Sequence, residues 1–174
     1  MGNQIFWRDT NHISATSMGL HKMHFPIRQP EVDIAKIGIE ALGIPYYQIK
    51  LEKGSIEGGD VLPMELNGNR YALIGQAERT SVEGAHAWYL LHQKEFEKNN
   101  IIPLLIRGPS ENTQTEMHLD TYFQQVSKNG VIHCGEITAN REVFQLYKSN
   151  NQVKERSLGS FYKYINHRFV DIYE

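Results

Sequence analysis

The sequence of 174 residues contains a single cysteine, Cys134, and carries little net charge. One thiol cannot form an internal disulfide or an all-cysteine zinc site, and it is typical of a reducing compartment. Lys and Arg total 18 and Asp and Glu total 20, a net charge of −2 that lacks the basic excess of nucleic-acid and anionic-membrane binders. No hydrophobic run reaches the roughly 20 residues of a membrane span, and residues 1–6 lack the features of a secretory signal. We therefore expect a cytoplasmic protein without nucleic-acid or membrane partners.

What is present is the composition of an ordinary globular domain. Hydrophobic residues make up 40% of the chain and charged residues 22%, which argues against intrinsic disorder. No low-complexity tract and no linker rich in Pro, Gly or Ser divides the sequence. These observations predict one domain over residues 1–174.

A recurring order of secondary structure is visible along the chain. Residues 13–25 have the pattern of one or two strands, Pro30 suits the first turn of a helix that Gly43 would end, and a strand follows over residues 44–51. In the second round, strands are expected at 60–66 and 71–74 around the turn Asn67-Gly68-Asn69.

The second helix and a third round complete this pattern. Thr80 and Glu83 have the spacing of a capping box, ahead of a helix to about residue 98 and a strand at 101–106. Strands are then expected at 121–126 and 131–135, with helices near 140–148 and 158–173 and no closing strand. Helix starts about 50 residues apart fall in the range of repeat architectures. The sequence therefore predicts an α/β fold of strand–strand–helix–strand (ββαβ) units, each of which must pack on a neighbour.

Acidic residues and glycines combine in the segment Glu57-Gly58-Gly59-Asp60. Paired glycines allow another segment or a ligand to approach the backbone closely, and an acidic residue beside them could bind a cation or move a proton. The alternative is a surface turn with solvated carboxylates.

His118-Leu119-Asp120 combines an imidazole with a carboxylate. In a strand, His118 and Asp120 would share one face while Leu119 pointed to the core. A neighbouring carboxylate favours the charged imidazole, which suits acid–base catalysis near neutral pH. Metal ligation and an ordinary strand histidine are the alternatives.

Two arginines and the cysteine allow further readings. Arg28 and Arg79 offer planar forks suited to a carboxylate or phosphate, or they form salt bridges. Cys134 lies within the strand-like run of residues 131–135, so we expect it to be a buried structural residue.

Five segments together resemble arginine deiminase, of the guanidino-group-modifying superfamily with the pentein fold. The opening is similar to the family's Asn-x-x-Phe-Thr-Arg-Asp, with Trp7 in place of Thr, and residues 23–28 resemble the segment that ends in a substrate-binding arginine. The others are similar to the family's Glu-Gly-Gly-Asp, Gly-x-x-Glu-Arg-Ser/Thr-Ser and Met-His-Leu-Asp-Thr motifs. In order, the segments are Asn3–Asp9, Met23–Arg28, Ile56–Val61, Gly75–Ser81 and Met117–Thr121.

The resemblance implies a reaction and a role for each residue. A cysteine attacks the guanidinium carbon of L-arginine, ammonia leaves, and water cleaves the amidino-cysteine to give L-citrulline, without a metal or organic cofactor. Glu57 and His118 would be the catalytic pair, with His118 moving protons. The implied substrate-binding residues, which hold the guanidinium, the α-carboxylate or the pocket wall, are Asn3, Phe6, Asp9, Arg28, Arg79 and Asp120.

The resemblance also implies a partial protein. The family's nucleophilic cysteine lies in a glycine-rich segment well after His-Leu-Asp, whereas Cys134 follows Asp120 closely. About two and a half of the five ββαβ units of the pentein propeller are expected, so the chain resembles a central fragment that is inactive alone. We expect it to pair with itself or with a complementing chain, because uncovered strand edges favour association. Alternatives are a non-catalytic guanidino-ligand binder or interaction module, and an amidinotransferase.

Overall fold

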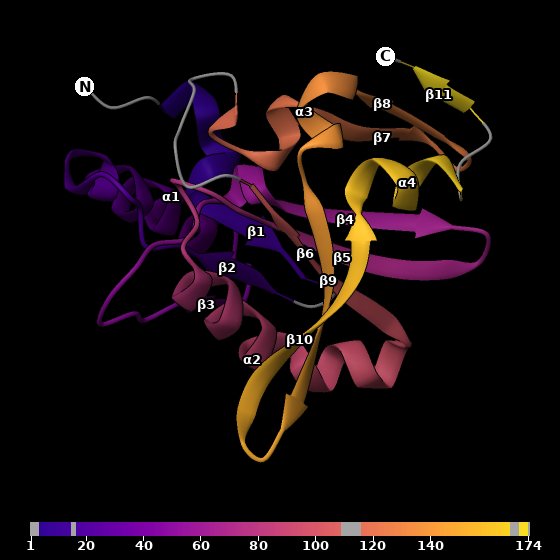
Figure 1. Cartoon of the computed structure of the whole chain (residues 1–174). Helices are drawn as coiled ribbons and strands as arrows, with labels where there is room; N and C mark the ends of the chain where they lie inside the picture. Colours follow the sequence, from indigo (N-terminus) through magenta and orange to yellow (C-terminus); the bar gives the residue numbers. More distant parts are fainter. Residues whose placement is uncertain (1–3, 15–16, 109–115, 168–170, 174) are drawn as a thin grey trace.

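A computed structural model describes residues 4–14, 17–108, 116–167 and 171–173. Its strands form three sheets, ordered β1-β2-β3, β10-β9-β6-β5-β4 and β11-β8-β7 (Figure 1). The fold is therefore mixed α/β, as predicted, and the described strands form separate sheets rather than one closed barrel. Within these residues, no helix combines the length and the apolar character needed to cross a membrane.

The first sheet contains two short strands, a helix and a third strand. Its elements are β1 (Asn11–Ile13), β2 (Met18–Leu20), α1 (Gln29–Ala41) and β3 (Tyr46–Gln48). β2 pairs antiparallel with β1 and parallel with β3. Pro30 lies in the first turn of α1, and Gly43 follows the helix with a positive φ of 65°, both as predicted.

The central sheet repeats this order with longer elements. They are β4 (Val61–Leu66), β5 (Asn69–Gln76), α2 (Val82–Asn99) and β6 (Ile101–Arg107). Asn67 and Gly68 both have positive φ, as a two-residue hairpin turn requires. The predicted Thr80–Glu83 capping box is wrong by one residue, because the Ser81 hydroxyl caps α2 and accepts a hydrogen bond from the Gly84 amide at 3.1 Å.

The third sheet contains β7 (Phe123–Ser127), β8 (Gly130–His133) and β11 (Asp171–Tyr173), and β11 runs parallel to β8. The expectation that this round has no closing strand is therefore wrong. Between β8 and β11 the chain forms α3 (Gly135–Ala139), β9 (Glu142–Ser149), β10 (Gln152–Ser160) and α4 (Phe161–Asn166). The order strand–strand–helix–strand thus recurs in all three sheets, with a β9–β10 hairpin inserted in the third.

The helices predicted near 140–148 and 158–173 are largely wrong, since the first range is mostly strand and α4 is short. Asn150 and Asn151 both adopt positive φ, which asparagine tolerates, and they turn the chain back into a hairpin. β9 pairs antiparallel with β6 and so extends the central sheet. The orange-to-yellow hairpin extends past α2 at one end of the molecule (Figure 1).

The hydrophobic core lies on both faces of the central sheet. On one face, Leu104 and Ile106 pack against the third sheet and Phe161, and Leu119 is fully buried in the same cluster. On the other face, Leu105 packs with Trp88 of α2. The alternation along β6 is that of a strand covered on both sides. Leu119 points to the core, as predicted, and so anchors the segment that carries His118.

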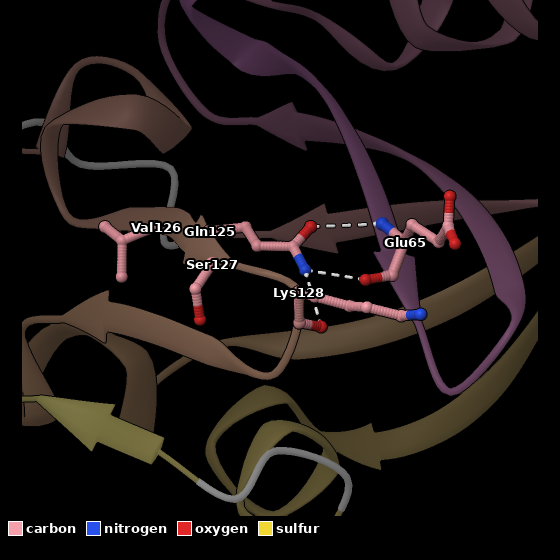
Figure 2. A pocket seen from close by; sticks show the side chains of 5 residues that line it. All are labelled: Glu65, Gln125, Val126, Ser127 and Lys128. Atoms are coloured by element: carbon pink, nitrogen blue, oxygen red, sulfur yellow. Dashed lines mark hydrogen bonds between the residues drawn. The ribbon is translucent and has the colours of Figure 1, made fainter.

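A side-chain amide covers the edge of the central sheet at β4. The Gln125 amide accepts a hydrogen bond from the Glu65 N–H at 3.0 Å and donates to the Glu65 carbonyl at 2.6 Å, as Figure 2 shows. It also donates to the Lys128 carbonyl at 3.3 Å. The Gln125 side chain, which lines a surface pocket here, therefore joins the third sheet to the central sheet. Its two hydrogen bonds to Glu65 imitate the pairing of a neighbouring strand and so protect an exposed edge.

Candidate functional site

Three segments from different parts of the chain meet where the predicted polar clusters lie. Asp9 belongs to the 3₁₀ segment η1 (Gln4–Thr10), Glu57 precedes η3 (Gly58–Asp60), and His118 precedes η5 (Leu119–Thr121). Their exposed fractions are 9%, 0% and 4%. One oxygen or nitrogen atom from each lies within 4.8 Å of the others. The structure thus brings together three residues that are far apart in sequence.

The two glycines of the Glu-Gly-Gly-Asp segment make this meeting possible. A Cβ at Gly58 would overlap the carbonyl oxygens of Arg8 and Asn11. A Cβ at Gly59 would lie 2.7 Å from Cγ of His118. The predicted close backbone approach is therefore present, and the surface-turn alternative is wrong because residues 57–60 are buried.

Glu57 and His118 form a buried hydrogen-bonded pair, with 2.9 Å between Oε2 and Nε2. Burial would raise the pKa of Glu57, but the hydrogen bonds from His118 and the His24 amide, with the charge of Arg79, hold it below its usual value. Burial would lower the pKa of His118, but the hydrogen bond to Glu57 and nearby carboxylates raise it above its usual value. Both shifts favour the charged forms, so the surroundings stabilise an ion pair of Glu57 and His118.

Arg28 lies against three carboxylates. Its Nη1 is 3.0 Å from Oδ2 of Asp9 and 3.4 Å from Oε2 of Glu57, and its Nη2 is 2.9 Å from Oε2 of Glu31. Burial would lower the pKa of Arg28, but the hydrogen bonds that it donates to Glu31 and Asp9 raise it. The salt-bridged alternative therefore describes Arg28. Glu31 was not predicted, although its position three residues after Arg28 on a helix is a recognisable pairing distance.

Arg79 is held less tightly than Arg28. Its Nη1 lies 3.6 Å from Oε2 of Glu57 and its Nε 3.7 Å from Oε2 of Glu78, both beyond hydrogen-bond distance. The guanidinium stacks on Phe25 at 4.4 Å from the ring centroid. Glu57 and Glu78 therefore balance the charge of Arg79 without accepting a short hydrogen bond from it.

Asp120 faces Arg8 instead of pairing with His118. Its Oδ2 lies 3.7 Å from Nε of Arg8, and its side chain is 25% exposed. Burial raises the pKa of Asp120, against the opposing charges of Arg8 and His118. The shared-face prediction is wrong because residues 119–121 form a 3₁₀ turn rather than a strand, so alternate residues do not share one face.

The two remaining predicted substrate-binding residues lie in the first segment. Phe6 is a large exposed hydrophobic residue, with 57% of its surface accessible. Asn3 lies outside the residues that the structure describes. Arg8 was not predicted as a site residue, yet its Nη2 donates to the Val61 carbonyl at 3.0 Å and holds η1 against β4.

Asp60 holds the segment that carries His118 in position. Its Oδ1 accepts a hydrogen bond from the Leu119 amide at 2.9 Å and thereby fixes the turn that carries His118. Burial raises the pKa of Asp60 to about 7, against the opposing influence of His118 and hydrogen bonds. Gly75 makes room for this carboxyl group, because a Cβ at that position would overlap Oδ1.

Cys134 differs from its prediction. It is exposed, has a free thiol and lies at the start of the five-residue helix α3, because β8 ends at His133. In the part of the chain that the structure describes, no hydrogen bond joins its thiol to Glu57 or His118. The expectation of a buried strand residue is therefore wrong.

In this structure the positive charge beside Asp9 and Glu57 comes from the side chain of Arg28. Asp9, Glu57 and His118 are close enough to share a metal ion. However, Arg28 Nη1 already contacts both carboxylates. The site can therefore orient a planar cation between carboxylates and move a proton through His118.

Comparison with known proteins gives one family match. The sequence profile described as arginine deiminase matches residues 1–171. No curated protein sequence matches the chain.

Several solved structures share the fold. Dimethylarginine dimethylaminohydrolase (DDAH) from Pseudomonas aeruginosa, a mutant complexed with citrulline, has 18% identity and a TM-score of 0.58, covering 98% of this chain and 69% of that one. A DDAH adduct with S-methyl-L-thiocitrulline has 20% identity and a TM-score of 0.59, covering 78% and 48%. The N-terminal domain of the cyanobacterial arginine dihydrolase ArgZ, bound to substrate, has 19% identity and a TM-score of 0.55, covering 77% and 45%. The chain thus spans about half the length of several structures that it matches.

Proposed function

Because this chain belongs to the arginine deiminase family, we propose that its buried cluster binds the guanidinium group of L-arginine and serves the hydrolysis of arginine to citrulline and ammonia. The observation that carries the proposal is the meeting of Asp9, Glu57 and His118 within 4.8 Å. A guanidinium ion is planar and permanently charged, and it pairs in a fixed geometry with carboxylates.

The guanidinium would lie between Asp9 and Asp120. The Arg8 guanidinium lies 3.7 Å from Oδ2 of Asp120, beyond hydrogen-bond distance, so this carboxylate can accept stronger hydrogen bonds from a ligand. Oδ1 of Asp9 lies 3.8 Å from Nδ1 of His118, also beyond hydrogen-bond distance. Two carboxylates that hold a poor electrophile in one orientation reduce the entropic cost of attack on its carbon.

Arg79 would bind the α-carboxylate of the substrate. Its ion pairs with Glu57 and Glu78, at 3.6 and 3.7 Å, are longer than hydrogen bonds, so little interaction is lost when it turns to a ligand. Arg28 would act with it, and Asn3 and Phe6 would border the substrate. Of the two arginines, Arg28 makes the shorter contacts with the protein. We therefore expect Arg28 mainly to hold Asp9 and Glu57 in place and Arg79 mainly to contact the ligand.

The proposed reaction uses His118 as acid and then as base. A thiolate attacks the guanidinium carbon, and the departing nitrogen takes a proton from His118 and leaves as ammonia. Neutral His118 then removes a proton from the water that attacks the amidino carbon. Collapse of that adduct breaks the C–S bond and releases citrulline and the thiolate, and the remaining hydroxyl proton passes to solvent. Glu57 stabilises the imidazolium at both stages, which is the usual task of an acid beside a catalytic histidine.

The thiolate is not assigned to Cys134. A nucleophilic cysteine needs an electropositive setting near its base, and Cys134 lies exposed at the start of α3. We therefore infer that a segment outside this chain supplies the nucleophile, that the chain alone binds arginine without turning it over, and that it associates with a second copy or a complementing chain. Retention of the carboxylate cluster with an exposed Cys134 equally suits a guanidino-ligand binder that is not catalytic.

Calorimetric titration with L-arginine and an assay for citrulline test these proposals. We expect the chain to bind arginine, to release no citrulline, and to lose at least tenfold in affinity in the Asp120→Ala variant, the scale of one charge-assisted interaction. Asp33→Ala is the matched control, because Asp33 is an exposed carboxylate on α1. Absence of arginine binding would refute the proposed site. Citrulline release that Cys134→Ser abolishes would refute our assignment of the thiol.

A further inference from the structure

A second polar cluster lies beside the first sheet, and the reaction above does not use it. His12 of β1, Tyr47 of β3 and His92 of α2 direct one donor atom each toward a common point. Nε2 of His12 lies 2.8 Å from Nε2 of His92, and the Tyr47 hydroxyl oxygen is 2.7 Å from Nε2 of His12 and also contacts Nε2 of His92. His12 and His92 are 7% and 5% exposed.

The outer nitrogens of these imidazoles fix where their protons are. His21 Nδ1 faces the Asp9 carbonyl oxygen at 3.2 Å, so it carries the proton and leaves His21 Nε2 as an acceptor. His12 Nδ1 lies 2.6 Å from that nitrogen and must donate to it. His92 Nδ1 faces the Glu95 carboxylate at 3.2 Å and donates in the same way. In neutral imidazoles, Nε2 of both His12 and His92 is then a bare acceptor.

We call the three atoms that meet here, Nε2 of His12, Nε2 of His92 and the hydroxyl oxygen of Tyr47, the triangle. Hydrogen bonds cannot satisfy all three of its contacts. The Tyr47 hydroxyl has one hydrogen and can donate it to only one of the two imidazoles. The contact between the two Nε2 atoms at 2.8 Å then joins two lone pairs. Two acceptors so close in a buried setting repel each other unless a cation lies between them.

Protonation of an imidazole would relieve this repulsion, but burial disfavours the charged form. It lowers the pKa of His12, whose charge His21 and His92 also disfavour, and it lowers the pKa of His92 despite the hydrogen bond to Glu95. It lowers the pKa of His21 to about 4. The crowding of lone pairs in the triangle is therefore the observation that calls for a cation.

We propose that His12, His92 and Tyr47 bind a divalent transition-metal ion of the Zn²⁺ class. Such an ion accepts the lone pairs of both imidazoles and of the phenol oxygen at once, and two nitrogens with one oxygen suit Zn²⁺ or Co²⁺ better than Mg²⁺ or Ca²⁺. Tetrahedral ligands at the usual Zn–N distance lie roughly 3.3 Å apart, so the two sides of the triangle that meet at His12 need to open by about half an ångström and the Tyr47–His92 side by more.

The surroundings of the triangle are those of a metal centre. Histidine ligands usually donate their outer N–H to a carboxylate or other acceptor, as His92 does to Glu95 and His12 does to His21. A cavity of about 460 Å³ borders His12, His92 and Glu95, so water or a small ligand could take a fourth position. Gly19 is also required, since a Cβ there would overlap His12 and lie 2.8 Å from Tyr47.

This centre is distinct from the guanidino site but adjoins it through His21. The Asp9 carbonyl is the last acceptor of the chain that runs from His12 through His21. The proposal does not depend on arginine binding, and it uses none of the residues to which we assign the reaction.

Titration of the chain with Co²⁺ tests the proposal, with visible absorption reporting the coordination. Cys134→Ser serves as the background, so that the exposed thiol does not contribute. We expect one equivalent to bind, with affinity reduced at least a hundredfold in His92→Gln and about tenfold in Glu95→Gln, the scale of losing an outer partner. His86→Gln should bind normally, because His86 lies on the same helix beside Glu155 but away from the triangle. Binding that survives His92→Gln but is lost in His118→Asn would overturn the proposal.

A measurement on the unmutated chain guards against variants that fail to fold. Addition of Zn²⁺ to the ¹⁵N-labelled protein should shift the Nε2 signals of His12 and His92, with the His86 signals unchanged. Unchanged signals for His12 and His92 at saturating Zn²⁺ would mean that the triangle holds only a shared proton, and the proposal would be wrong.

Discussion

Asp60→Asn should make the protein less sensitive to alkaline pH. Asp60 is fully buried, and its pKa is raised from 3.8 to about 7. A pKa that is higher in the folded state gives stability that is complete below the unfolded value of 3.8 and is lost as the pH rises through 7. Asparagine resembles the protonated acid and can still accept the hydrogen bond from Leu119.

The size of this effect follows from the shift. About three pKa units at 1.36 kcal/mol each give a loss of up to about 4 kcal/mol, of which about 3 kcal/mol falls between pH 5 and pH 8. Urea unfolding of the native protein and of Asp60→Asn at these two pH values measures it. We expect the variant to gain in free energy of unfolding relative to the native protein as the pH rises.

The control is Asp33→Asn, which removes an exposed carboxylate from α1. Its free energy of unfolding should follow that of the native protein at both pH values. A constant difference between Asp60→Asn and the native protein across this range would show that Asp60 is ionised throughout, and the reasoning from burial would fail.

Three further changes probe the site and its scaffold. Glu57→Gln should lower the pKa of His118 to below its usual 6.5, because burial is then opposed only by weaker charges, and the imidazole NMR signals report this. Gly58→Ala should destabilise by about 3 kcal/mol in chemical unfolding, since its Cβ meets backbone oxygens that cannot move aside, and an unchanged unfolding midpoint would contradict the close approach. Ser81→Ala should cost about 1 kcal/mol by loss of the α2 cap, and Ser127→Ala, at an exposed position of β7, serves as its control.

Local signals predicted much of the scaffold. Asn67-Gly68 specified a hairpin turn because both residues tolerate positive φ, and the helix pattern of α2 was long enough to be unambiguous. The same chemistry recurs at Asn150-Asn151, where a hairpin forms in place of the predicted helix. Pairing of β9 with β6 stabilises it, and that partner lies far away in sequence.

The sequence predicted which residues belong to the candidate site better than it predicted how they lie relative to one another. The glycines of Glu57-Gly58-Gly59-Asp60 indicated a close approach, which the packing against His118 and Arg8 confirms. Periodicity placed Asp120 beside His118, but a 3₁₀ turn separates them.

The second cluster had no local signal at all. His12, Tyr47 and His92 become neighbours only when β1, β3 and α2 pack together. Its hydrogen-bond arrangement depends on the tautomers that the Asp9 carbonyl and Glu95 impose from outside the triangle.

The most direct test of a guanidinium site in this chain is a comparison of L-arginine with L-lysine as ligands, followed at the imidazole signals of His118. Both amino acids carry one positive charge on a long side chain, but only arginine presents the planar fork that paired carboxylates recognise. We predict that arginine shifts the His118 signals in a saturable manner and that lysine at the same concentration leaves them in place. Equal shifts with both ligands, or none with arginine, would contradict the proposed site.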